Sequence, residues 1–309
     1  MKVLLAIDGS KCSEDAARML SHLPHQETLD LTILSVVAAP ITAFYSPAKQ
    51  FMDEITEDDR RFARKRQAAI EEMFTGANAI VQTKIREGRP AETIVDFAAA
   101  CSADLIVVGA KGHSQIDRIL LGSTSDYVAT HAHCSVLVVR PTGLAERKHS
   151  DLKVAVAYDA SRASHAALQE LLLFDWGPKT EITVVGVAGY SPVFNPEFGF
   201  NPEVLQREAK NALRDAREKM ESRVANIHDV VVEYDHVAEG LVKYTEDHDS
   251  DIIVVGDTGR STLARALLGS VSRHVLRHAK CGVWITRNQI NAGLHNDDHE
   301  ESDSLAETS

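Results

Sequence analysis

The chain has 309 residues, of which 44% are hydrophobic and few are aromatic, and its formal net charge is -12. This length suits two globular domains of about 140 residues each. The acidic charge, with no basic stripe to offset it, argues against a nucleic-acid partner, and no apolar stretch is long enough to span a bilayer. Because the chain opens on a short strand rather than on a basic and apolar leader, we expect a cytoplasmic protein without a membrane partner.

Strands and helices alternate along the first half of the chain. Apolar runs predict strands at residues 3–7, 29–37, 79–86, 105–108 and 136–140, and helices are expected from near Ser13 and over residues 56–74, 91–101 and 123–131. The strands lack period-two polarity, which is typical of a parallel sheet covered on both faces. The sequence therefore predicts an α/β fold.

A glycine motif follows the fourth predicted strand. Gly109, Gly112 and Gly122 are spaced as Gly-x-x-Gly-(nine residues)-Gly, and Ser123 then opens a helix. Glycines allow a ligand to approach the backbone closely, and the free N–H groups of a helix start suit phosphates. Parallel strands share one carboxyl edge, so Asp8 after the first strand is expected to border the same crevice. Read alone, the motif could equally make only tight turns.

The second half of the chain repeats this order. Strands are predicted at 154–158, 182–187, 230–236, 251–255 and 283–286, with a helix near 202–224. The motif recurs as Gly256, Gly259, Gly269 and Ser270, and each position lies 147 residues after its counterpart. A coincidental pattern would not repeat with its strand and spacing intact, so the chain is a tandem duplication.

The duplication sets the expected domain boundaries. We expect a first domain at 1–142, a linker at 143–150, a second domain at 151–288, and a disordered acidic tail at 289–309. Asp8 and Asp159 are 151 apart while the glycines are 147 apart. We assign the missing residues to a shorter third helix in the second repeat.

These motifs resemble the universal stress protein family, in the subset that carries an ATP-binding Gly-x-x-Gly-(nine)-Gly-Ser/Thr pattern. The resemblance covers residues 2–140 and 153–287. It implies two tandem Rossmann-like domains, each with a five-stranded parallel sheet and helices on both faces. It also implies two sites for ATP, or for AMP or ADP, at Ala6, Asp8, Val36, Gly109, Gly112, Gly122, Ser123 and Thr124, and at Ala157, Asp159, Val187, Gly256, Gly259, Gly269, Ser270 and Val271. Either aspartate could instead cap its own turn, and both roles can coexist.

The two sites differ in charge. Lys111 stands between the first two glycines of the first repeat, where the second repeat has Asp257 and offers only Arg260 nearby. A phosphate would meet a cation in one site and a carboxylate in the other. We therefore expect weaker or no triphosphate binding in the second repeat.

The sequence favours binding over fast catalysis. No lysine follows the glycines as in Gly-Lys-Ser/Thr loops, and no base is placed beside a γ-phosphate. We expect a nucleotide-dependent sensor in the stress response that presents a surface to an unidentified regulatory protein. The alternatives are a slow ATPase or nucleotidyl-transfer enzyme, and a scaffold whose sites are empty relics.

Metal and redox chemistry have little support in the sequence. The four cysteines lack CxxC spacing, which favours reduced thiols, and His274 and His278 are four apart with no third ligand at a suitable spacing. Magnesium held by ATP phosphates is the better expectation. The last strands of the two repeats are edges that need a partner, so we expect an internal pseudo-dimer, with homo-oligomers of the whole chain left open.

Overall fold

The computed structural model describes residues 1–25, 27–37, 48–112, 121–142, 151–188, 202–257 and 268–287. For residues 48–55 and 202–205 it describes only the backbone. The predicted linker, the acidic tail, Arg260 and Gly259 lie outside the described residues. Among the residues that are described, no helix has both the length and the apolar character that crossing a membrane requires.

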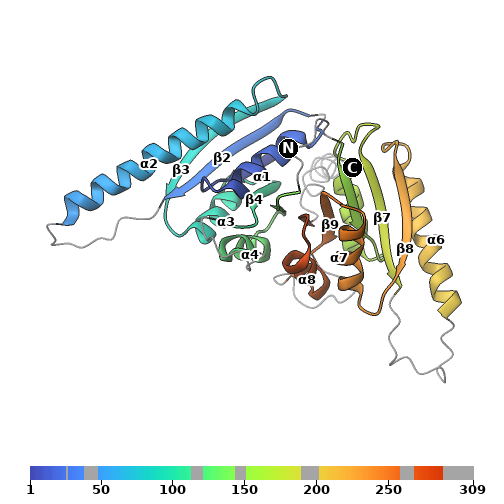
Figure 1. Cartoon of the computed structure of the whole chain (residues 1–309). Helices are drawn as coiled ribbons and strands as arrows, with labels where there is room; N and C mark the ends of the chain where they lie inside the picture. Colours follow the sequence, from blue (N-terminus) through green and yellow to red (C-terminus); the bar gives the residue numbers. More distant parts are fainter. Residues whose placement is uncertain are drawn as a thin grey trace, which may run out of the picture.

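The first repeat contains the alternating elements that the sequence predicts, coloured blue to green in Figure 1. They are β1 (Lys2–Ala6), α1 (Lys11–His22), β2 (Leu29–Val37), α2 (Ala48–Glu72), β3 (Ala79–Glu87), α3 (Pro90–Ala100), β4 (Leu105–Gly109), α4 (Ser123–His131) and β5 (Ser135–Val139). The short central strands β1, β4 and β5 are almost entirely buried, because helices cover both of their faces.

The second repeat has the same order, coloured green to red. Its elements are β6 (Lys153–Ala157), α5 (Arg162–Leu171), β7 (Glu181–Ala188), α6 (Pro202–Met220), β8 (Ile227–Glu233), α7 (Val237–Asp247), β9 (Ile252–Gly256), α8 (Ser270–His278) and β10 (Gly282–Thr286). The predicted α/β fold, with two similar domains in tandem, is confirmed.

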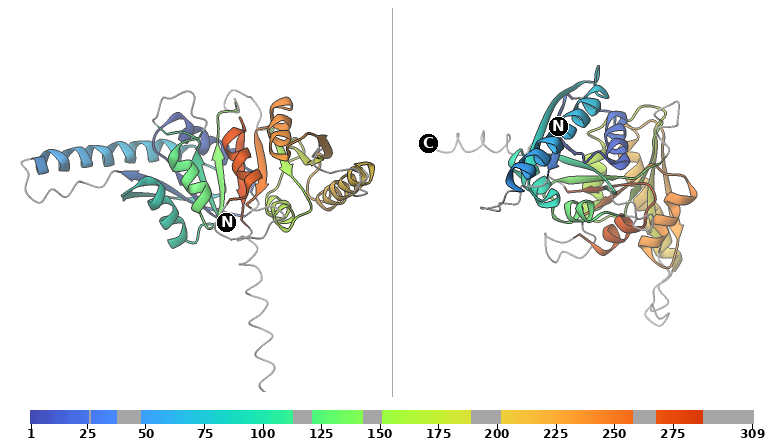
Figure 2. Two further views of the ribbon diagram at one scale, coloured as in Figure 1. Left: turned by 90° about the horizontal axis from the view of Figure 1, so that it is seen from below. Right: turned by 60° about the vertical axis from the view of Figure 1, so that its left-hand side comes forward.

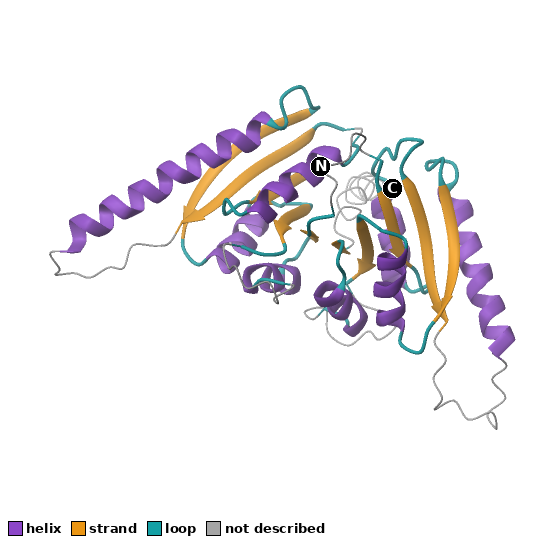
Figure 3. Cartoon of the chain, viewed as in Figure 1, coloured by secondary structure: helices purple, strands orange, loops and turns teal. Residues whose placement is uncertain are grey.

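The strands form one continuous ten-stranded sheet in the order β3-β2-β1-β4-β5-β10-β9-β6-β7-β8. The two repeats meet where β5 and β10 pair antiparallel, with Leu137 opposite Trp284, and the other strand pairs are parallel. The last strands therefore cover each other in the middle of the sheet, as expected for an internal pseudo-dimer. Two layers of helices cover the sheet, with α1, α2, α5 and α6 on one face and α3, α4, α7 and α8 on the other (Figure 3). At one end of the sheet α2 reaches beyond the strands (Figures 1 and 2).

The first helix begins earlier than predicted. Ser10, not Ser13, is the N-cap of α1, and its hydroxyl accepts the Ser13 N–H at 3.2 Å. The Ser13 hydroxyl points back and donates to the Ser10 carbonyl at 2.8 Å. The sequence offers two serines at the right spacing, and the prediction chose the one inside the helix.

The prediction of a shorter third helix in the second repeat is wrong. Both α3 and α7 have 11 residues. The difference lies between the second and third strands, where α2 has 25 residues and α6 has 19. Strand pairing agrees, because Leu34 pairs with Lys84 and its counterpart Val185 pairs with Val230, so the separation between repeats falls from 151 to 146 across this segment.

Some predicted boundaries also move. Helix α2 begins at Ala48 rather than near residue 56, and α6 ends at Met220 rather than near residue 224. Strand β8 begins three residues earlier than predicted because Ile227 pairs with Ile182 of β7. Pairing with a neighbouring strand, which a single segment does not reveal, sets these strand ends.

A buried carboxyl group lies at the seam between the two repeats. Glu170 of α5 is 2% exposed and accepts hydrogen bonds from the Ser135 hydroxyl of β5 at 2.7 Å and from the Trp284 indole of β10 at 2.8 Å. The Ser135 oxygen in turn accepts the backbone N–H of Arg287 at 2.9 Å. The network ties three elements from both repeats together, and burial raises the pKa of Glu170 to about 7.

Two arginines brace the same seam. Arg287 donates through its guanidinium to the carbonyl oxygens of Ala129, in the last turn of α4, and of Cys134. Arg140 occupies the equivalent position in the first repeat and donates to the Leu276 carbonyl in the last turn of α8. A cation at a helix C-terminus is favoured by the partial negative charge there. Each repeat therefore caps a helix of the other.

The turn after the first strand of each repeat adopts a left-handed conformation. Gly9 has φ +83° in the first repeat, and Ala160, 151 residues later, has φ +60° in the second. Because alanine is strained there, Ala160→Gly is expected to raise the free energy of unfolding by roughly 0.5 to 1 kcal/mol. Urea denaturation measures the change, and a fall in stability would contradict this account of the turn.

Candidate functional site

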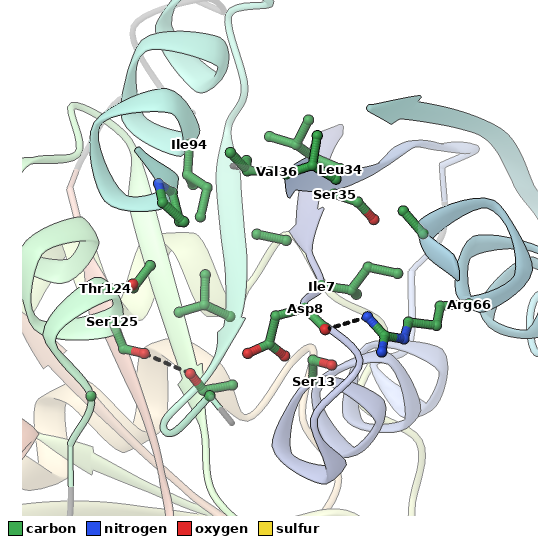
Figure 4. A pocket seen from close by; sticks show the side chains of 18 of the residues that line it. Ile7, Asp8, Ser13, Leu34, Ser35, Val36, Arg66, Ile94, Thr124 and Ser125 are labelled. Atoms are coloured by element: carbon green, nitrogen blue, oxygen red, sulfur yellow. Dashed lines mark hydrogen bonds between the residues drawn. The ribbon is translucent and has the colours of Figure 1, made fainter. Parts of the chain in front are cut away.

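A cavity of about 500 Å³ opens at the carboxyl ends of β1, β2 and β4. All nine site residues predicted for the first repeat line it: Ala6, Asp8, Val36, Gly109, Lys111, Gly112, Gly122, Ser123 and Thr124. Figure 4 shows Asp8 in the middle of the pocket, with Val36 above it and Thr124 on the far side. The structure thus brings together residues that are up to 118 positions apart, from Ala6 to Thr124.

The turn after β1 is fixed by its own side chains. Oδ1 of Asp8 accepts the Ser10 N–H at 2.9 Å, and the Ser13 hydroxyl accepts the Gly9 N–H at 3.2 Å. The Ser10 hydroxyl donates to the carbonyl oxygen of Lys111 at 3.2 Å, which joins this turn to the glycine segment. Asp8 therefore does have the turn-capping role, and its second oxygen remains on the side of Gly112.

The glycines are placed where side chains would collide. A Cβ atom on Gly109 would lie 2.6 Å from the backbone carbon of Cys12 in α1, and one on Gly112 would lie 2.6 Å from Oδ2 of Asp8. The chain closes back at Gly122, whose N–H donates to the Ala110 carbonyl at 2.7 Å. Because Gly109 and Gly112 have no side chains, α1 can pack close to the end of β4 beside the cavity.

Helix α4 starts at the cavity with its backbone donors. Its N-cap is Gly122, which supplies no side-chain hydrogen bond to the first turn. Ser123 and Thr124 are the first helical residues and line the cavity, and the hydroxyl of Ser125 donates to the Gly109 carbonyl at 2.7 Å. An uncapped helix N-terminus offers unpaired N–H groups and positive partial charge to an anion.

One wall of the cavity comes from α2, which the sequence analysis did not assign to the site. Asp59, Phe62, Ala63 and Arg66 of this helix all line it. Nη1 of Arg66 donates to the carbonyl oxygen of Asp8 at 2.9 Å (Figure 4). The sequence signal that could have found them is their spacing of three and four residues along a long helix, but nothing in the sequence alone tells which face turns to the cavity.

Comparison with known proteins identifies the family. The universal stress protein family model matches residues 1–140 and again residues 152–287. The chain belongs to the universal stress protein family. A universal stress protein of Mycobacterium tuberculosis is 27% identical over 290 residues, which cover 92% of this chain and 96% of that protein. One of Methanocaldococcus jannaschii is 32% identical over 143 residues, 45% of this chain and 81% of that protein.

A solved structure of similar size supports the fold. A universal stress protein from Archaeoglobus fulgidus superposes with a TM-score of 0.61 at 21% identity, covering 93% of this chain and 98% of that chain. Because the identity is low, this similarity supports the fold alone, which is a tandem α/β architecture.

The second universal stress protein repeat places its predicted residues at equivalent points. Ala157 ends β6, Asp159 follows in the turn, Val187 lies in β7, Gly256 ends β9, Gly269 is the N-cap of α8, and Ser270 and Val271 begin that helix. The contacts are equivalent as well. Asp159 accepts the Ser161 N–H at 3.0 Å, Ser272 donates to the Gly256 carbonyl at 2.6 Å, and the Gly269 N–H donates to the Asp257 carbonyl at 2.7 Å.

The two universal stress protein repeats differ in what surrounds these points. The side chain of Leu213 in α6 packs onto Gly186, where a Cβ atom would lie 2.9 Å from Cδ1 of Leu213. In the first repeat the equivalent strand residue is Ser35, and both Ser35 and Ala63 line the cavity. Burial lowers the pKa of Arg287, and the nearby charge of Asp257 acts against this lowering. The second site thus has a leucine packed against its strand and a carboxylate near the seam arginine.

The remaining titratable groups do not form a metal site in the described part of the chain, where no group of three or more His, Cys, Asp and Glu side chains could hold an ion. The four cysteines are free thiols. Cys134 and Cys281 are each 3% exposed, and burial raises their pKa to about 12 and about 11. They are therefore neutral packing groups.

Proposed function

We propose that this universal stress protein binds an adenine nucleotide (ATP, or else AMP or ADP) in the cavity of its first repeat. The observation that carries the proposal is the convergence of the nine predicted residues on one cavity of about 500 Å³, which is within the usual range for small-molecule sites. The cradle fits the ligand, since side chains are missing at Gly109 and Gly112 where a Cβ atom would collide. In this arrangement the phosphates lie at the N-terminus of α4 and near Lys111, and the nucleoside lies toward Asp8 and Val36.

The lining residues favour binding over turnover. The carboxylates of the cavity are Asp8 and Asp59, and Asp8 already holds the turn through Ser10. Lys111 lies between the first two glycines, whereas the lysine of a Gly-Lys-Ser/Thr loop stands directly before the hydroxyl residue, a place where this chain has Gly122 followed at once by Ser123. ATP would be bound with its magnesium carried on the phosphates, and occupancy would alter the surface that a regulatory protein recognises. The alternative is a slow ATPase or nucleotidyl-transfer enzyme.

The proposal also includes a cytoplasmic location for the protein. Four free thiols suit the reducing cytoplasm. The expected domain boundaries, near residues 142 and 151, and assembly of whole chains into homo-oligomers belong to the same proposal. The second repeat is proposed as the weaker triphosphate site, supported by Asp257 in place of Lys111 and by the packing of Leu213.

Mass spectrometry of gently purified protein tests the proposal. We expect an adenine nucleotide to co-purify, and added ATP to be recovered intact after hours in a single-turnover assay with radiolabelled ATP. Stoichiometric conversion of ATP would favour the enzyme. Absence of bound nucleotide together with no binding at millimolar ATP would favour the empty scaffold.

A further inference from the structure

The α2 wall of the cavity carries an aromatic ring and a cation one helical turn apart. Phe62 and Arg66 both line the cavity, and residues four apart on a helix lie side by side. Phe62 is large and apolar, yet 48% of it is exposed. The guanidinium carbon of Arg61 lies over the ring, 5.9 Å from its centroid, and the ring is still half-exposed. A half-exposed ring at a cavity, with cations beside it, is a surface that a flat ligand can cover.

Arg66 is held against the turn that follows β1. Its Nη1 donates to the Asp8 carbonyl at 2.9 Å, and its guanidinium occupies the position that a Cβ atom of residue 9 would take. It lies there because Gly9 has no side chain. In Figure 4, Arg66 approaches Asp8 from the side opposite Thr124 and Ser125.

The second repeat lacks this wall. Three buried residues of each helix region share one spacing: Ala63, Ile70 and Phe74 near α2, and Leu213, Met220 and Val224 near α6. The buried residue after the first of them differs, Gln67 in α2 and Ala216 in α6. This register sets Ala212 at the position of Phe62 and Ala216, which is fully buried, at the position of Arg66. Neither alanine offers an aromatic face or a charge.

The turn changes together with the helix. Where the first repeat has Gly9, the second has Ala160 in the same left-handed conformation. The methyl group of Ala160 takes the place that the Arg66 guanidinium occupies in the first repeat. The arginine and the space that receives it are therefore both present in one repeat and both missing in the other.

Building on the nucleotide binding proposed above, we propose that Phe62 and Arg66 are the base-recognition wall of the first repeat and make it selective for purine nucleotides. The N-terminus of α4 is the phosphate-binding end of the cavity, so the opposite wall faces the base. Phe62 stacks on the base, and Arg66, steadied by the Asp8 carbonyl, stacks on it or donates to a ring nitrogen. The double ring of a purine spans both side chains, whereas a pyrimidine covers one.

Titration calorimetry of the full chain with ATP, CTP and inorganic tripolyphosphate tests this wall. The wild type is expected to bind ATP at least about tenfold more tightly than CTP, and Phe62→Ala or Arg66→Ala to weaken ATP binding by about tenfold. Gly9→Ala is expected to act like Arg66→Ala, because the new methyl group displaces the Arg66 guanidinium. Unlike Arg66→Ala, this variant keeps the positive charge of Arg66. Tripolyphosphate binding is expected to stay within about twofold in every variant, since none alters the phosphate end.

Arg64→Ala is the matched control. Arg64 is on the same helix, pairs with Glu57 and does not line this cavity, so its loss is expected to leave ATP binding unchanged. The wall is refuted if Arg66→Ala and Gly9→Ala both bind ATP as the wild type does, or if tripolyphosphate binding falls in parallel with ATP binding. A wild type that binds no nucleotide would instead refute the proposed function itself.

Discussion

Replacing Gly112 by valine is expected to lower the affinity of the first repeat for ATP by about 100-fold, or about 2.7 kcal/mol. A Cβ atom at this position would lie 2.6 Å from Oδ2 of Asp8. The carboxylate would have to move, and a branched side chain would stand between Asp8 and the start of α4, where the ligand approaches. Titration calorimetry of the full chain with ATP measures the loss.

The fold is expected to survive this change, because the atom met is the end of a side chain and not backbone. Gly177→Ala is the matched control, since a Cβ atom there has nothing within 4 Å. Thermal melting of both variants is expected to match the wild type within a few degrees, about the effect of 1 kcal/mol or less. A Gly112→Val protein that melts normally and binds ATP within about threefold of the wild type would contradict the assigned cradle.

The second large effect is expected at Glu170. Burial raises the pKa of this carboxyl from 4.5 to about 7, against the lowering effect of hydrogen bonds from Ser135 and Trp284. Among more distant charges, Asp104 raises the pKa and Arg287 lowers it. Between these two pH values the unfolded chain loses the proton while the folded chain keeps it. The free energy of unfolding therefore falls as pH rises through this window, by roughly 3 kcal/mol at about 1.36 kcal/mol per unit.

Glu170→Gln removes the titration while keeping the shape and a hydrogen-bonding group. The wild type is expected to lose stability relative to this variant between pH 5 and pH 8, as urea denaturation at several pH values measures. Glu218→Gln, on the exposed surface of α6, is the control and is expected to follow the wild type. A stability difference between wild type and Glu170→Gln that stays constant from pH 5 to pH 8 would rule out a titrating carboxyl at the seam.

The part of the site built on strand ends was predictable from sequence. Asp8, Gly109 and Val36 follow or end parallel strands, and such strands place their carboxyl ends along one edge whatever the rest of the chain does. The same glycine spacing occurs after Gly109 and again after Gly256, which a chance turn would not explain. The α/β fold followed from the same alternation of elements.

The α2 wall could not be predicted because it depends on how a helix is rotated against the sheet. The stretch around Phe62 and Arg66 is strongly charged, and such a stretch reads as a solvated helix face. The hydrogen bond from Arg66 to the Asp8 carbonyl joins residues 58 positions apart and requires the space left by Gly9. Glu170 was equally hidden, since its partners Ser135 and Trp284 come from the seam between repeats.

The crystal structure of the full chain soaked with a non-hydrolysable ATP analogue at saturating concentration is the most direct measurement. We expect density for the phosphates at Gly122 and Ser123, and for the nucleoside between Asp8 and Val36. A first-repeat cavity without ligand density, in a crystal where it opens to solvent, would contradict the proposed function.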